Sequence, residues 1–159
     1  MWSSMVAVVG TLAGVLTAGL LQHRAARTAR AEDRADARRQ EKLAAVTNLA
    51  TALDAHRSAM FHRERLGMTD GPDGAADPEA RLAAQTTSHD TRAAITAPLI
   101  RLQVLVPELT APAQAAADAT YALRNATTTP ELNVLRRAAK AAAVAFVVSA
   151  AAVLTPDHH

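Results

Sequence analysis

Three side chains that could bind a metal or move a proton lie close together in the chain: His56, His62 and Glu64. The two histidines are six residues apart, which places them about 240° apart around a helix. This spacing matches neither an HExxH zinc motif nor an i, i+4 ligand pair. We therefore expect surface histidines rather than a metal site. His158 and His159 end the sequence and are expected to be mobile.

The rest of the chain carries no other catalytic signature. It has no cysteine, no GxSxG sequence, no phosphate-binding loop and no Rossmann glycine pattern. An enzyme needs convergent polar side chains, whereas this chain is dominated by alanine, leucine and valine. The sequence therefore predicts a protein that is not an enzyme and that needs no cofactor.

A group of basic residues is better suited to binding than to catalysis. Residues 22–42 include seven basic and four acidic side chains. Five of the basic residues fall within about 120° of one another on a helix, at 100° per residue. These five, the basic stripe, are Arg24, Arg30, Arg34, Arg38 and Lys42. The acidic residues Glu32, Asp33 and Asp36 occupy the opposite side, and Glu41 is the exception.

The basic stripe has several possible partners. Anionic lipid headgroups attract such clusters by about 1 kcal/mol per basic residue near the membrane surface. DNA phosphates or the acidic side of a neighbouring helix offer the same chemistry. A topology signal on a solvated helix also explains the stripe without any ligand. Sequence-specific DNA reading is not expected, because stacking aromatic residues and a recognition-helix pattern are absent.

The element before the stripe is an uncharged run, Trp2–Leu21. As a helix it is about 30 Å long, which matches the hydrocarbon thickness of a bilayer. A cleavable signal peptide would need a basic stretch before the run and small residues at a cleavage site after it. A buried core helix would not be apolar all round and then continue directly into a polar helix. The run is therefore expected to be a membrane anchor.

The flanking charges predict the orientation of this anchor. All the basic residues near it follow Leu21, and none precedes Trp2. The positive-inside rule then places the N-terminus outside the cytoplasmic membrane, Trp2 at the outer interface and the body in the cytoplasm.

Small residues recur every four positions within the anchor, at Gly10, Gly14 and Ala18. Such a face lets two membrane helices approach closely, so the spacing predicts a homo-oligomer. The alternative is that small residues are simply frequent in an alanine-rich chain.

The body is expected to be all-α, because no sustained apolar and polar alternation indicates a strand. The first helix is predicted to run to about Leu66. Its distal part presents an apolar stripe for a core, formed by Leu43, Val46, Leu49, Ala50, Leu53 and Met60. Its proximal part has only alanine as an apolar residue, which predicts a solvated stalk.

Proline and glycine divide the remaining chain. The segment Gly67–Pro78 predicts a flexible loop, and Asp77 followed by Pro78 predicts the start of a second helix. This helix is expected to end near Ala97, where Pro98 kinks or interrupts it. A further helix is expected from Pro112 to before Thr127. Another is expected over 129–154, with Thr129 as the cap before Pro130, and the structure of 98–107 stays open. Short links between helices favour an up-and-down bundle.

The last of these helices contains a second uncharged segment, Ala141–Leu154, which follows Arg136, Arg137 and Lys140. As a helix it is about 21 Å long, which is short for a membrane span and normal for a core helix. We expect a core helix. The alternative is a second span in a membrane-active protein that is lethal when overproduced.

Several stretches resemble the KilB-type proteins of Streptomyces and related actinobacteria. They are QHRAARTARAEDRADARRQEKLAAV after the anchor, and the segments Ala52–Arg57, Ala97–Leu102 and Ala119–Arg124. The resemblance covers nearly the whole chain. It implies an accessory role in conjugative plasmid transfer or spread, membrane association, and harm on overproduction without a matching repressor. It brings no catalytic residues.

These observations predict a single-span membrane protein with an anchor at 1–21, a basic stalk at 22–42, a cytoplasmic helical bundle at 43–155 and a tail at 156–159. The expected partners are anionic lipids, further copies of the chain and other plasmid-transfer proteins. The alternative is a membrane-tethered protein that binds DNA non-specifically through the stalk arginines.

Overall fold

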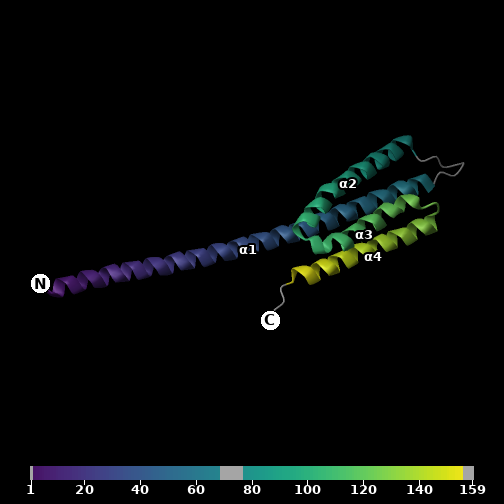
Figure 1. Ribbon diagram of the computed structural model, residues 1–159. Coiled ribbons are helices and arrows are strands. Elements are labelled where there is room, and N and C mark those ends of the chain that lie inside the picture. Colours follow the sequence, from purple (N-terminus) through teal and green to yellow (C-terminus); the bar gives the residue numbers. More distant parts are fainter. Residues whose placement is uncertain (1, 69–76, 156–159) are drawn as a thin grey trace. The chain divides into compact units, whose positions relative to one another are not determined.

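The computed structural model describes the backbone of residues 2–68 and 77–155, and side chains from Arg27 onward except at 28, 29 and 31. Within these ranges the chain forms helices and no strand, so the predicted all-α class is confirmed (Figure 1). The long helices are α1 (Trp2–Met68), α2 (Pro78–Leu105), α3 (Thr110–Tyr121) and α4 (Thr129–Leu154). Two short 3-10 helices, η1 (Pro107–Leu109) and η2 (Ala122–Asn125), connect α2 to α3 and α3 to α4.

The chain divides into two compact units, Met1–Gln40 and Glu41–His159. The described part of the first unit is a stretch of α1. The second unit holds the rest of α1 and all the other helices. The boundary falls where alanine gives way to larger apolar residues, because only the latter can bury enough surface to hold other helices.

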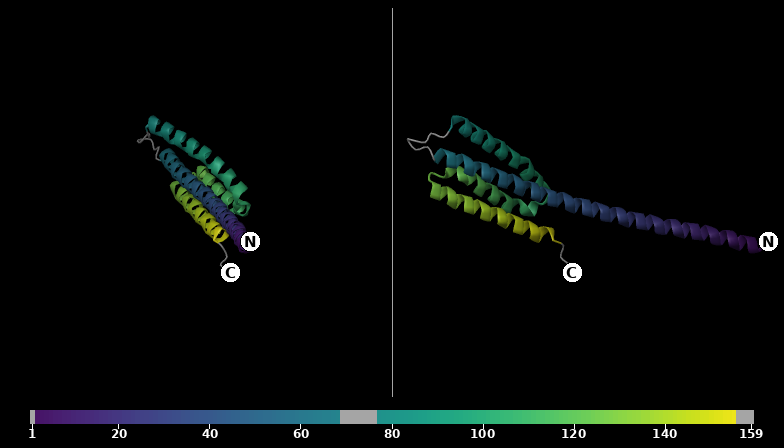
Figure 2. Two further views of the ribbon diagram at one scale, coloured as in Figure 1. Left: turned by 90° about the vertical axis from the view of Figure 1, so that its left-hand side faces the viewer. Right: turned by 180° about the vertical axis from the view of Figure 1, so that it is seen from behind.

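The second unit is an up-and-down bundle. Consecutive helices run antiparallel, and α2 and α4 lie on either side of the pair formed by α1 and α3 (Figures 1 and 2). Short connections such as η1 and η2 favour this arrangement, because they return the chain to a neighbouring position.

Two clusters of buried residues hold the bundle together. The larger cluster joins all four helices and includes Leu53, Ile95, Leu102 and Phe146. The smaller one lies around Met60, Leu123, Leu132 and Ala139. Of the predicted core stripe on α1, Val46, Leu49, Leu53 and Met60 are buried and Ala50 is half-buried, but Leu43 is 47% exposed.

The starts of α2 and α4 follow their capping residues. Asp77 is the N-cap of α2, as predicted, and its Oδ1 accepts a hydrogen bond of 3.0 Å from the backbone N–H of Glu79. At α4 the N-cap is Thr128 rather than the predicted Thr129. The carboxylate of Glu131 completes this cap by accepting a 2.8 Å bond from the backbone N–H of Thr127.

The predicted end of the second helix near Ala97 is wrong. Helix α2 continues through Pro98 to Leu105. Ile95 and Leu102 are fully buried on either side of the proline, and Leu99 packs against the same cluster. This packing outweighs the single backbone hydrogen bond that Pro98 removes. The helix ends instead before Pro107, with Val106 at φ −143° and ψ 74°, outside the helical region that a following proline disfavours.

The third helix also differs from its predicted bounds. It begins at Thr110, so Pro112 lies in the first turn, where a helix needs no backbone donor. It ends at Tyr121, and η2 completes the segment that was predicted to remain helical until Thr127.

Candidate membrane- and phosphate-binding surfaces

The basic stripe lies on a continuous stretch of α1. Arg30, Arg34 and Arg38 are exposed, and among the side chains that the structure describes none forms a salt bridge with them. Lys42 is half-buried where the bundle begins. The side chain of Arg24 lies outside the described residues. The three exposed guanidinium groups therefore remain available to phosphate groups.

One basic residue of this face was missed. Arg27 follows Arg24 by three residues, so it falls inside the same sector of the helix, and its side chain is exposed. The sequence already contained this signal, since spacings of three and four residues both keep a side chain on one face.

The acidic exception within the stripe has a structural partner. Glu41 Oε1 accepts a hydrogen bond of 3.1 Å from Arg101 Nη2 of α2. Both side chains are about half exposed, so the pair contributes little to stability. Its consequence is electrostatic, because Arg101 offsets the negative charge that would otherwise interrupt the stripe.

The anchor and its small-residue face fall largely outside what the structure describes. The backbone of Trp2–Leu21 is helical as part of α1. The surroundings of Gly10, Gly14 and Ala18, however, are not part of what the structure describes. Membrane insertion and self-association through this face therefore remain predictions.

Within the described part of the chain, one helix is long and apolar enough to cross a membrane, and it is α4. Only 17% of its most apolar window is buried inside the bundle. Phe146 and Ala150 pack into the core, which is the predicted behaviour of Ala141–Leu154. The other side of the same segment is not covered, since Val144 is 55% and Val148 62% exposed.

A basic hollow lies at the other end of α4. It has a volume of about 320 Å³ and is lined by Arg57 of α1 and by Asn133, Arg136, Arg137 and Lys140 of α4. Arg57 is paired with Asp54, and the guanidinium group of Arg136 stacks 4.2 Å from the centre of the Phe61 ring. Arg137 and Lys140 are exposed. The hollow thus brings four cationic side chains together beside one carboxylate.

The prediction of surface histidines is wrong for His56 and right for His62. His62 is exposed, whereas His56 is 1% exposed between α1, α2 and α3. The His56 ring meets the Tyr121 ring edge to face at 5.6 Å, and the guanidinium group of Arg92 lies 4.6 Å from the Tyr121 ring centre. The burial of His56 was not predicted because it depends on a neighbouring helix. A single sequence does not show which histidines on a mostly polar helix a neighbour covers.

The surroundings of His56 keep its ring neutral. Burial, and then the charges of Arg92 and Arg63, lower the pKa of His56 from 6.5 to about 4. Its Nδ1 lies 3.0 Å from the Thr91 hydroxyl, which itself donates to the Thr87 carbonyl. Because that hydroxyl proton is already used, Nδ1–H is the donor to Thr91, which fixes the tautomer.

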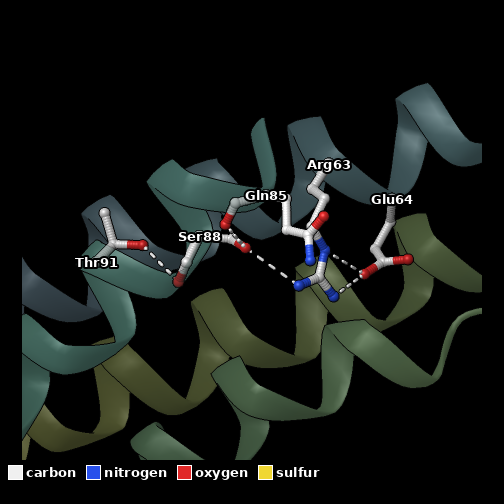
Figure 3. Close-up of polar contacts among 5 residues, drawn as sticks. All are labelled: Arg63, Glu64, Gln85, Ser88 and Thr91. Carbon is white, nitrogen blue, oxygen red and sulfur yellow. Dashed lines mark hydrogen bonds and ion pairs between the residues drawn. The ribbon is translucent and has the colours of Figure 1, made fainter. Parts of the chain in front are cut away.

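A second polar contact joins α1 to α2 next to this histidine (Figure 3). Arg63 Nη1 donates to Ser88 Oγ at 3.1 Å, and Arg63 Nε donates to Glu64 Oε1 at 3.0 Å. The Ser88 hydroxyl donates in turn to the Gln85 carbonyl at 2.7 Å. These bonds fix the register of the two helices.

The polar groups of the bundle satisfy one another. Among the described residues, no buried side-chain nitrogen or oxygen lacks a hydrogen-bond partner. The same residues contain no group of three or more His, Cys, Asp or Glu side chains able to hold a metal. The described surface does present exposed cations and exposed valines.

Comparison with known proteins points to one family. A family model described as KilB plasmid transfer protein matches residues 43–154. Protein KilB of Streptomyces lividans is 50% identical over 151 residues, which cover 95% of this chain and 97% of the relative. No solved structure matches the chain.

Proposed function

The chain belongs to the KilB family of plasmid transfer proteins, and from this membership we propose that it acts in plasmid transfer as a non-catalytic scaffold anchored in the membrane. In this proposal Trp2–Leu21 spans the cytoplasmic membrane once, with Met1 outside. The bundle then lies in the cytoplasm, where it recruits other transfer proteins and further copies of the chain.

The observation that carries this proposal is the exposed row Arg30, Arg34 and Arg38, which follows an uncharged helical run of membrane-spanning length. Basic residues flank a membrane span on its cytoplasmic side, and those nearest the span contact anionic phosphates in the headgroup region. The family match supports the plasmid role, and the row of arginines supports the membrane-bound site of action.

Fractionation tests the anchor. The full-length protein is compared with a chain that begins at Gln22, each carrying a C-terminal fluorescent or phosphatase reporter. We expect the full-length protein to sediment with membranes and to fluoresce, and the shortened chain to be soluble. An active phosphatase fusion would contradict the orientation, and a shortened chain that still sediments would favour a second span.

Self-association is tested inside the membrane with a two-hybrid assay. Replacing Gly10 and Gly14 by isoleucine should abolish the signal, because the larger side chains keep the helices apart. Gly19→Ile is the matched control, since Gly19 lies on the opposite side of the helix. An unchanged signal in the double variant would remove this part of the proposal.

DNA binding through the same arginines is the competing function. It predicts sequence-independent retardation of DNA that weakens steeply as salt rises. If the detergent-solubilised protein fails to retard DNA at low salt, this alternative is removed. Loss of DNA retardation in the Arg34→Gln/Arg38→Gln variant would favour DNA over lipid as the ligand of the basic stripe.

A further inference from the structure

The outward side of α4 combines cations and valines in one continuous stripe. At 100° per residue, its members fall within about 120° of one another. They are Arg136, Arg137, Lys140, Val144, Val147, Val148 and Ala151, called here the α4 stripe. The three cations occupy the first part of the stripe and the apolar residues the second.

This stripe faces away from the bundle core. The residues that α4 buries are Leu132, Ala139, Phe146 and Ala150, and their sector of the helix is centred about 120° from that of the stripe. Val144, Val147 and Val148 are between 46% and 62% exposed. Neither core cluster includes any of them, so intramolecular packing does not account for this row of valines.

The charge beside these valines selects the kind of partner. Arg137 and Lys140 are exposed, and Arg57 adds a third cation to the same hollow. Among the described side chains, neither Arg137 nor Lys140 takes part in a salt bridge. A partner that fits the stripe must therefore be anionic at one end of α4 and apolar along the other.

We propose that the α4 stripe docks on an anionic lipid bilayer, with the cations on headgroup phosphates and the valines at the boundary of the acyl chains. An amphipathic helix that lies in the interface uses this combination. The inference rests on the proposed membrane location of the protein. It adds a second membrane contact, made by the bundle itself.

Two other occupants fit less well. DNA would use the cations but would leave the valines in water. A second copy of α4 would place cations against cations in a parallel pair, and charged groups against valines in an antiparallel pair. A lipid surface is the partner that satisfies both parts of the stripe.

The helix lies on the bilayer rather than across it. A span would pull Phe146 and Ala139, both fully buried, out of two core clusters. The uncharged segment Ala141–Leu154 would cover about 21 Å of a hydrocarbon layer of about 30 Å. Docking on the surface keeps the core intact and uses only the outward side chains of α4. It also requires α1 to bend between the anchor and the bundle, because α4 runs antiparallel to α1.

The absence of cysteine from the chain makes a direct test possible. The full-length protein carries a single cysteine, from Val148→Cys, labelled with a polarity-sensitive fluorophore. Ala93→Cys on α2 is the control, because it is exposed and α2 and α4 lie on either side of α1 and α3 (Figure 2). Both proteins are reconstituted in phosphatidylglycerol and in phosphatidylcholine vesicles.

We expect a blue shift and quenching by brominated lipid for the label at position 148 in phosphatidylglycerol only, and no change at position 93. Bromine near the headgroups should quench more than bromine deep in the bilayer. Equal exposure of the label in both lipids would overturn the proposal. Stronger quenching by bromine deep in the bilayer would indicate that α4 spans the membrane instead. If the labels on two copies of the protein lie close together in both lipids, α4 forms a dimer contact instead.

Charge variants test the electrostatic part of this proposal. Arg137→Gln/Lys140→Gln should lower the ratio of docked to undocked label about 25-fold, at about fivefold per basic residue. Arg39→Gln/Arg124→Gln removes as much charge from exposed positions outside the stripe and should leave the ratio unchanged. An equal effect of the two pairs would overturn the role of the stripe.

The design separates this inference from the proposed function. If the anchor is absent, the protein fails to float with phosphatidylcholine vesicles. If the anchor is present and α4 does not dock, the protein floats with both lipids while the label at position 148 stays in water.

Discussion

The stalk in α1 and the outward side of α4 both combine cations with an uncharged segment, but in opposite order along the chain. In the stalk, cations follow an uncharged run, whereas in α4 they precede one. The stalk has only alanine as an apolar residue and buries nothing in the described range 32–40. Helix α4 buries one side in the core and leaves the other exposed. Charge alone therefore defines the stalk, whereas α4 also has to pack into the bundle and still leaves one side exposed.

The largest expected effect separates the two sides of α4. Phe146→Ala removes the largest fully buried side chain and should lower the free energy of unfolding by about 3–5 kcal/mol. Val148→Ala, on the exposed side, should change it by less than about 0.5 kcal/mol. Chemical denaturation of both variants gives the comparison. A similar loss for the two would mean that the outward side is covered in the folded protein.

The next effect concerns His56, a buried polar residue on the part of α1 that does pack. Its pKa is about 4 in the folded protein and about 6.5 in the unfolded chain, so the unfolded chain binds the proton more tightly. Stability is therefore highest above pH 6.5. It should fall by up to about 3 kcal/mol as the pH drops towards 4.

The groups that face His56 are Arg63 on α1, Arg92 on α2 and Tyr121 on α3. Denaturation curves measured between pH 7 and 4 should lose this dependence in His56→Gln. They should keep it in His62→Gln, because His62 is exposed. All other titratable groups near His56 are common to the two variants. A slope that persists in His56→Gln would assign the acid sensitivity to another group.

A smaller effect tests the stalk. Arg27→Gln/Arg30→Gln, the first described arginines after Leu21, should weaken contact with anionic headgroups by up to about 2 kcal/mol, at about 1 kcal/mol per basic residue near the surface. A single label at Ala31→Cys, which falls within the sector of the basic stripe, reports this contact through its accessibility to aqueous iodide. The variant should leave the unfolding free energy unchanged, since both arginines are exposed. A loss of stability would contradict the description of 22–42 as a solvated stalk.

Local signals predicted most of the fold, and long-range packing accounts for the errors. Asp77 with Pro78 fixed the start of α2, because capping chemistry depends on neighbours in sequence. The continuation through Pro98 was missed because it depends on Ile95 and Leu102 meeting other helices. The burial of His56 and the pairing of Glu41 with Arg101 depend in the same way on α2, which lies far along the chain.

The candidate surfaces show the same difference between local signals and long-range packing. The basic stripe follows from the 3.6-residue period alone, so sequence predicts it, and Arg27 could have been included. The outward valines of α4 were assigned to a core, because composition does not reveal which half of an apolar helix its neighbours cover. Only the arrangement of α3 and α4 distinguishes Phe146 from Val148.

The smallest expected effect tests how α4 begins. Thr128 Oγ1 accepts from the backbone N–H of Glu131 at 3.4 Å, whereas Thr129 lies inside the helix. Thr128→Ala should therefore cost about 1 kcal/mol of unfolding free energy, and Thr129→Ala should cost a few tenths at most. The two threonines are neighbours of identical chemistry, so the pair isolates the cap from any general loss of a hydroxyl. If Thr129→Ala proved the more costly, α4 would start one residue later. The N-terminal turn that precedes the cations of the α4 stripe would then have to be redrawn.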